Sequence, residues 1–135
     1  MKKYFMKIAI LNFIATCFIV LSCNSQTAKT IQIIDSNTFE TAIKVQKNLQ
    51  LIDVRTAEEF AEYHVLNAQN INYNNDLFTI TVEKLNKTEP VFVYCKAGGR
   101  SAKAAQKLAE LGFVKIYDLE GGIINWIENK KPIVK

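Results

Sequence analysis

The sequence predicts an α/β domain built on a parallel sheet. Short apolar segments alternate with helix-favouring segments along most of the chain, the pattern of strand–helix–strand units with right-handed crossovers. One segment, Val91–Tyr94, has four consecutive β-favouring residues after Pro90, as expected for a strand buried on both faces. Ligands of such sheets bind outside the carboxyl ends of the strands. We therefore expect the functional residues to follow strands.

The first half of the predicted domain alternates strands with capped helices. Asn37 with Glu40 is the expected capping pair of the first helix, and Thr56 with Glu59 forms a capping box for the second. The expected elements are, in order, a strand over 31–34, a helix over 38–46, a strand over 49–54, a helix over 56–63 and a brief strand near residue 71.

The second half continues the alternation. Residues 76–85 are predicted as a helix although their centre, Thr79–Val82, is β-branched, which disfavours helix. After the 91–94 strand, residues 101–111 are rich in strong helix formers and are followed by Gly112. A strand over 114–117 and a final helix over 122–128 complete the prediction.

The chain around Cys95 indicates a site that handles anions. Cys95 ends the 91–94 strand, and a helix begins shortly after it. Unpaired N–H groups and the positive end of the helix dipole favour an anion there, so the position favours the nucleophilic thiolate. An inert buried thiol beside an ordinary turn is the alternative interpretation.

The loop after Cys95 strengthens the reactive interpretation. Gly98 and Gly99 suit a backbone that takes positive φ and turns its amides inward around an anion. Arg100 adds a planar fork of donors, and Lys96 adds a second positive charge. We therefore expect the substrate-binding residues to be Lys96, Ala97, Gly98, Gly99 and Arg100.

The N-terminal residues have the pattern of an export signal. Basic residues precede an apolar run over 8–21 that ends in small residues, so we predict a signal peptide over 1–22. The segment Val20–Cys23 (VLSC) resembles the bacterial lipobox, which implies that Cys23 carries a lipid. Residues 23–30 then form a polar tether and 31–135 the domain. The expected product is an exported lipoprotein, anchored to a membrane and facing the periplasm or the cell exterior. An uncleaved N-terminal anchor helix is the alternative.

Charge and cysteine content narrow the function classes. Residues 1–22 hold three lysines and no acids, so their removal reduces the 17 basic residues to 14, against 13 acidic ones. That balance gives no reason to expect a nucleic-acid partner. Cys17 leaves with the signal and Cys23 carries lipid, so Cys95 remains as an unpaired, reactive thiol. One histidine and one thiol do not make a metal site, and we expect no metal or cofactor.

Three segments carry a family resemblance: LIDVRTAEEFAEYH at 51–64, VYCKAGGRS at 93–101 and LEGGIINWIENKKPI at 119–133. Their order and spacing are similar to those of single-domain rhodaneses, which are sulfurtransferases. The resemblance implies a five-stranded parallel sheet and a catalytic Cys95 that carries sulfur as a persulfide. One departure is Val65–Asn67 after the histidine, where the family usually has proline and glycine.

The resemblance also assigns structural roles near the site. It implies that Asp53 and Arg55 form an ion pair beside the active loop, and that His64, the only histidine, packs at a helix end. A direct catalytic role for Asp53 or Arg55, or a general-base role for His64, is the less favoured alternative. Trp126 is expected to pack the last helix on the core. Three acids of the 56–63 helix are expected to be a solvated face: Glu58, Glu59 and Glu62.

The implied reaction moves sulfur from an anionic donor, thiosulfate or polysulfide, to a thiol or cyanide acceptor in a monomeric enzyme. Two alternatives stay open. Related phosphatases and arsenate reductases place five residues between cysteine and arginine, whereas this chain has four, Lys96–Gly99. A membrane-tethered sulfur relay with little turnover of its own would use the same loop.

Overall fold

The centre of the domain is a five-stranded sheet. The computed structural model describes residues 30–135. The strand order is β1-β5-β4-β2-β3, and every pairing between neighbours is parallel. The strands are β1 (Ile31–Ile34), β2 (Gln50–Asp53), β3 (Gln69–Asn70), β4 (Val91–Tyr94) and β5 (Ile116–Leu119). The predicted α/β class and five-stranded parallel sheet are confirmed.

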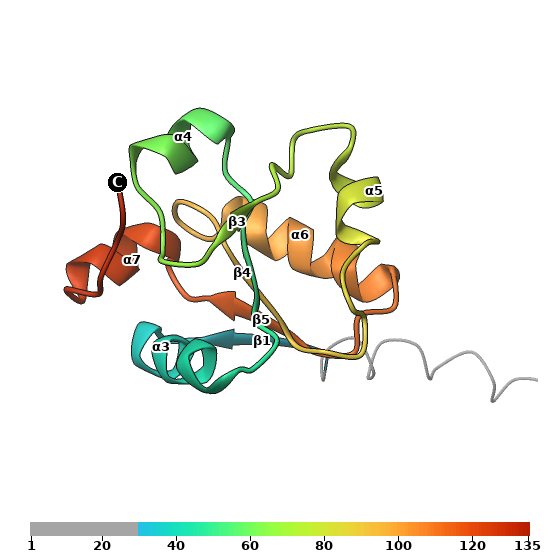
Figure 1. The fold of residues 1–135 in the computed structure, drawn as a ribbon, viewed down its shortest axis with the longest axis horizontal. Helices are drawn as coiled ribbons and strands as arrows, with labels where there is room; N and C mark the ends of the chain where they lie inside the picture. Colours follow the sequence, from blue (N-terminus) through green and yellow to red (C-terminus); the bar gives the residue numbers. More distant parts are fainter. Residues whose placement is uncertain (1–29) are drawn as a thin grey trace, which may run out of the picture.

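Helices cover both faces of this sheet (Figure 1). One face packs against α5 and α6, and the other against α3 and α7. The helices are α3 (Ser36–Val45), α4 (Ala57–Glu62), α5 (Phe78–Val82), α6 (Gly99–Glu110) and α7 (Gly122–Glu128). The central strand β4 is therefore buried on both faces, as its apolar sequence predicts.

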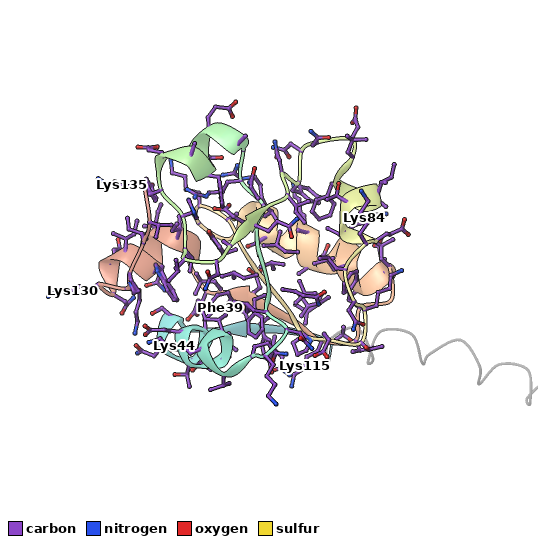
Figure 2. The ribbon with its side chains drawn as sticks, in the orientation of Figure 1. Phe39, Lys44, Lys84, Lys115, Lys130 and Lys135 are labelled. Atoms are coloured by element: carbon purple, nitrogen blue, oxygen red, sulfur yellow. The ribbon has the colours of Figure 1, made fainter. Side chains whose placement is uncertain are left out.

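Alternation along β4 divides the core into two clusters. Val93 and Cys95 belong to the cluster on the α6 face, whereas Phe92 and Tyr94 belong to the cluster that contains Trp126. Trp126 is 1% exposed, so its predicted packing role is confirmed. In Figure 2 Phe39 lies inside, between α3 and the sheet, while five labelled lysines lie at the periphery: Lys44, Lys84, Lys115, Lys130 and Lys135.

The first helix begins earlier than predicted. Asp35, rather than Asn37 with Glu40, is its N-cap, and its Oδ1 accepts the N–H groups of Asn37 at 2.9 Å and Thr38 at 3.0 Å. Asp35 precedes the predicted N-cap by two residues, and its carboxylate satisfies two free N–H groups at once. Glu40 instead pairs with Lys44 and Lys131.

Two elements of the second half differ from their predicted bounds. The helix expected over 76–85 is limited to α5, Phe78–Val82, and its β-branched centre is helical. After it the N–H groups of Lys84 and Leu85 donate three residues back, to Thr81 and Val82, so the chain tightens into a turn. The strand expected over 114–117 is β5, Ile116–Leu119, where Ile116 pairs with Val91 of β4 and Ile31 of β1. Pairing with neighbours, which is not local in sequence, fixes this register.

No helix within residues 30–135 is long and apolar enough to cross a membrane. The predicted signal peptide, the lipidation of Cys23 and the tether up to residue 29 lie outside the described residues.

Candidate functional site

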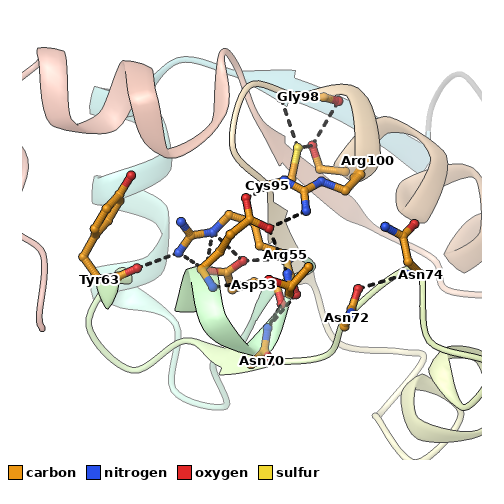
Figure 3. Close-up of polar contacts among 12 residues, drawn as sticks. Asp53, Arg55, Tyr63, Asn70, Asn72, Asn74, Cys95, Gly98 and Arg100 are labelled. Carbon is orange, nitrogen blue, oxygen red and sulfur yellow. Dashed lines mark hydrogen bonds and ion pairs between the residues drawn. The ribbon is translucent and has the colours of Figure 1, made fainter. Parts of the chain in front are cut away.

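The loop after β4 places a thiol at the start of a helix (Figure 3). Cys95 is 1% exposed, and its Sγ accepts the N–H of Gly98 at 3.1 Å. Gly98 is the N-cap of α6 and has φ of +111°, a left-handed conformation that glycine adopts without strain. Because α6 begins at Gly99, the N–H that touches the sulfur belongs to the helix N-terminus, where an anion is favoured. Lys96 and Ala97 are exposed at the tip of the loop.

The N-terminus of α7 fixes the orientation of this loop. The N–H of Ile123 donates to the Cys95 carbonyl at 2.9 Å, and the N–H of Ile124 donates to the Lys96 carbonyl at 3.1 Å. In trans peptides the N–H groups that follow these carbonyls point away from α7. A Cβ on Gly122 would lie 2.5 Å from the Lys96 oxygen and 2.6 Å from the Cys95 oxygen, so only glycine permits this approach.

Arg100 does not present a free donor fork. Its Nη1 donates to Oε2 of Glu59 at 2.6 Å, and its Nη2 donates to Oε1 at 2.9 Å. The Arg100 guanidinium holds the pKa of Glu59 at about 2, and the same bonds raise the pKa of Arg100. The structure thus brings Arg100 to the loop as predicted, but with its charge already paired.

Glu59 is one residue near the site whose role sequence reasoning missed. The prediction of a solvated face holds for Glu58 and Glu62, which are exposed, and is wrong for Glu59, which is half-buried. The capping box with Thr56 is confirmed, and Glu59 Oε2 accepts the Thr56 N–H at 3.0 Å. That local bond was visible in the sequence, whereas the bond to Arg100 joins positions far apart and leaves no local pattern.

Asp53 and Arg55 form the predicted ion pair, buried at the end of β2 (Figure 3). Arg55 donates to both Asp53 carboxylate oxygens, at 2.7 Å from Nη2 and 3.0 Å from Nε. Nη2 also donates to the Tyr63 carbonyl at 2.6 Å, which ties the end of α4 to the sheet. Asn70 donates to the carbonyls of both residues of the pair. These bonds position α4, and with it Glu59, beside the active loop.

His64 packs at the end of α4, as the resemblance implied. Its Nδ1–H donates to the Phe60 carbonyl at 2.9 Å, and its ring stacks on Phe60 with centroids 3.8 Å apart. Its backbone forms an antiparallel bridge with Val134. None of its described contacts reaches Cys95, which favours the structural interpretation over a general base.

The unusual segment Val65–Asn67 lines a cavity of about 500 Å³ together with α3, Trp126 and Pro132. Val65 is buried, and its N–H donates to the Tyr94 hydroxyl at 3.0 Å. Leu66 is exposed, and Asn67 has φ of +66°. The departure from the family pattern therefore shapes a hollow on the α3 and α7 side of the sheet.

Ser101 and Asp118 are two further polar residues buried near the thiol. Ser101 Oγ lies 3.5 Å from Cys95 Sγ and also donates to the Gly98 carbonyl at 3.2 Å. Asp118 is 3% exposed, and burial raises its pKa to about 6 although the Ser101 hydroxyl lowers it. Within residues 30–135 no cluster of three or more histidine, cysteine or acidic side chains is arranged to hold a metal ion.

Comparison with protein families and curated proteins is consistent with this geometry. The family model described as Rhodanese-like domain matches residues 35–129. A sulfurtransferase of Allochromatium vinosum is 31% identical over 101 residues, 75% of this chain and 92% of that protein. Thiosulfate sulfurtransferase 16 of Arabidopsis thaliana is 33% identical over 91 residues, 60% of this chain and 76% of that protein.

Solved structures agree with the fold. A rhodanese-related protein from Thermoplasma volcanium superposes with a TM-score of 0.67 and 31% identity over 76% of this chain and 97% of that chain. A rhodanese-like domain protein from Staphylococcus aureus gives a TM-score of 0.62 and 30% identity over 70% of this chain and 90% of that chain.

Proposed function

Since the chain belongs to the rhodanese-like domain family, we propose that it is a sulfurtransferase that carries sulfane sulfur as a persulfide on Cys95. The observation that carries the proposal is the bond from the Gly98 N–H to Cys95 Sγ at the N-terminus of α6. A sulfur anion is favoured at that position, both as the thiolate nucleophile and as the persulfide. The sulfurtransferase names of its relatives support the same class.

In the first step the Cys95 thiolate attacks the outer sulfur of thiosulfate. A new sulfur–sulfur bond forms to Cys95, the sulfur–sulfur bond of the donor breaks, and its electron pair leaves with sulfite. The backbone N–H groups of the loop, turned away from α7 by the bonds to the Cys95 and Lys96 carbonyls, are available to hold the anion. The exposed Lys96 favours the approach of a charged donor.

In the second step an acceptor nucleophile attacks the outer sulfur of the persulfide, and the Cys95 thiolate leaves with the electron pair. Cyanide serves as acceptor in the assay, and a thiol is the proposed cellular acceptor. Cys95 lies under its loop and is 1% exposed, so a small acceptor reaches it more readily than a folded partner. This burial speaks against the relay alternative, which needs an open thiol.

Two features support sulfur transfer over phosphate chemistry. The loop has four residues between Cys95 and Arg100, one fewer than in the related phosphatases. The guanidinium of Arg100 is also bound to both oxygens of Glu59, so it is not free to clamp a tetrahedral oxyanion. We therefore place the chain with the sulfurtransferases.

A turnover assay tests the proposal. The purified full-length chain is supplied with thiosulfate and cyanide, and thiocyanate is measured for the wild type and for Cys95→Ser. We expect thiocyanate only from the wild type. Hydrolysis of a phosphate ester without thiocyanate would overturn the proposal, and a stable persulfide without turnover would favour the relay.

Export and lipidation of Cys23 are a separate proposal, which the 1–22 pattern and the lipobox-like VLSC support. The Cys23→Ser variant should leave the membrane fraction of the expressing bacterium, while the wild type stays in it. Recovery of the wild type with residues 1–22 intact in the soluble fraction would contradict it.

A further inference from the structure

A buried acid lies on the same face of the sheet as the thiol. Asp118 of β5 is the register partner of Val93 of β4, so the two side chains point to one face. Val93 belongs to the core cluster with Cys95 and with residues of α6. Because Cys95 stands two residues after Val93, Asp118 and Cys95 both project towards α6.

The hydroxyl of Ser101, at the start of α6, is near both the acid and the thiol. The Cys95 thiol donates to its Oγ at 3.5 Å, and the hydroxyl is close enough to the Asp118 carboxyl to lower the pKa of that group. A serine hydroxyl has one proton to donate. The Gly98 carbonyl, the Asp118 carboxylate and a Cys95 thiolate are the acceptors available to that proton.

Asp118 does not have the environment of a structural acid. Among residues 30–135, the buried Oδ1 of Asp118 has no hydrogen-bond partner, and no basic side chain forms an ion pair with this acid. Asp53, the other buried acid of the sheet, instead has Arg55 on both of its oxygens. A buried carboxylate without a charge partner is unfavourable for folding, so stability does not explain why an acid stands at 118.

Few other charges face this group. Strand β1 carries no titratable side chain, and β4 contributes only Tyr94, which points to the opposite face. On α3, Glu40 pairs with Lys44 and Lys131. On α6, Arg100 forms an ion pair with Glu59, and Lys107 forms one with Glu110. The remaining charged residue of this helix, Lys103, is exposed. Of these groups, Arg100 is the one that interacts with Cys95.

We propose that Asp118 is a positioning residue for Cys95, and that its charge decides, through the Ser101 hydroxyl, whether the sulfur receives a hydrogen bond. An ionised Asp118 accepts the Ser101 proton and withholds it from the sulfur. A neutral Asp118 donates its own proton to Ser101 Oγ, and the Ser101 hydroxyl then turns to the thiolate or persulfide. This inference rests on the proposed function in one respect: it takes Cys95 Sγ as the atom that carries the persulfide.

Site-resolved alkylation tests this coupling without any sulfur donor. The rate at which iodoacetamide modifies Cys95 is measured by peptide mass spectrometry across pH for the full-length wild type and Asp118→Asn. Asparagine has the shape of the acid and stays neutral. The ratio of variant to wild-type rate should be near one below the Asp118 pKa of about 6 and rise above it. We expect a rise on the order of threefold to tenfold, since one pKa unit of interaction corresponds to tenfold.

The controls separate a through-hydroxyl link from a general charge effect. Asp76→Asn removes an exposed acid and should leave the rate unchanged at every pH. In a Ser101→Ala background, the pH dependence of the Asp118→Asn ratio should largely disappear. A ratio that is independent of pH, or one that persists without Ser101, overturns the proposal. Thermal unfolding of each variant verifies that it is folded. If Asp118 affects the alkylation of Cys95 as expected but Cys95 takes no sulfur from a donor, the proposed function is refuted and the role of Asp118 is not.

Discussion

Arg100 in the active loop and Glu59 at the third position of α4 form a bidentate ion pair, with N–O distances of 2.6 and 2.9 Å. Glu59 also completes the capping box of α4, so one carboxylate joins the start of that helix to the loop. The pair neutralises a positive charge that interacts with Cys95. Because the pKa of Glu59 is about 2, the carboxylate stays ionised and this neutralisation persists at neutral pH.

Glu59→Gln should increase the use of an anionic donor. Glutamine keeps the capping box, but the Arg100 charge is no longer compensated, which favours approach of thiosulfate. We expect the persulfidation rate of Cys95 at low thiosulfate to rise about twofold to tenfold, and the gain to shrink at high salt. Initial rates against donor concentration measure this effect.

Glu58→Gln is the matched control, because Glu58 is the exposed neighbour and its removal changes the net charge equally. An equal gain in both variants, or a lower rate in Glu59→Gln, would contradict the assigned role of the pair.

Gly122→Ala should abolish sulfur transfer. The new Cβ would meet the Lys96 and Cys95 carbonyl oxygens at 2.5 and 2.6 Å, and these are the groups by which α7 orients the loop. Gly112→Ala is the control, since Gly112 also has a positive φ but has open space around its Cβ. Both variants should lose about 1 kcal/mol or more of unfolding free energy because of φ. Activity retained by Gly122→Ala in the turnover assay would show that the loop does not depend on this approach.

Asp53→Asn should destabilise the domain strongly. The change leaves the buried Arg55 guanidinium without its charge partner, and such losses are about 3 kcal/mol or more. Urea unfolding measures the free energy. Glu110→Gln, which breaks the exposed Lys107–Glu110 pair, should change it by less than about 1 kcal/mol. If Asp53→Asn lowered the unfolding free energy by no more than Glu110→Gln does, the buried pair would not be what holds β2 to α4.

Asp118→Asn should stabilise the domain, and more so at neutral than at acid pH. Burial raises the pKa of Asp118 from 3.8 to about 6, so the folded state holds the proton more tightly than the unfolded state. The wild type therefore loses stability as pH rises between these values, whereas asparagine does not titrate. The difference in unfolding free energy should grow to about 3 kcal/mol above pH 6. A difference that stays constant with pH would mean that Asp118 has an ordinary pKa.

Features that depend on residues close together in the sequence were predicted correctly. The bounds of β4 and α7 and the capping box of α4 agree with the structure, because composition and short-range hydrogen bonds determine them. The position of Cys95 at the end of β4 and the start of a helix follows from the same local pattern.

Features that depend on distant partners could not be predicted in this way. The register of β5 is set by pairing with β1 and β4. Glu59, the partner of Arg100, lies on α4, and β3, α5 and β4 separate that helix from α6 in the sequence. The proximity of Asp118 to Ser101 also arises only when β5 packs against α6. A single sequence records each of these residues but not their juxtaposition.

Intact and peptide mass spectrometry of the full-length chain after incubation with thiosulfate tests whether Cys95 carries sulfur as a persulfide. We expect a gain of one sulfur atom, located on Cys95, that cyanide removes and that Cys95→Ser never acquires. A chain that takes no sulfur on Cys95 from thiosulfate, polysulfide or mercaptopyruvate while remaining folded would contradict this expectation.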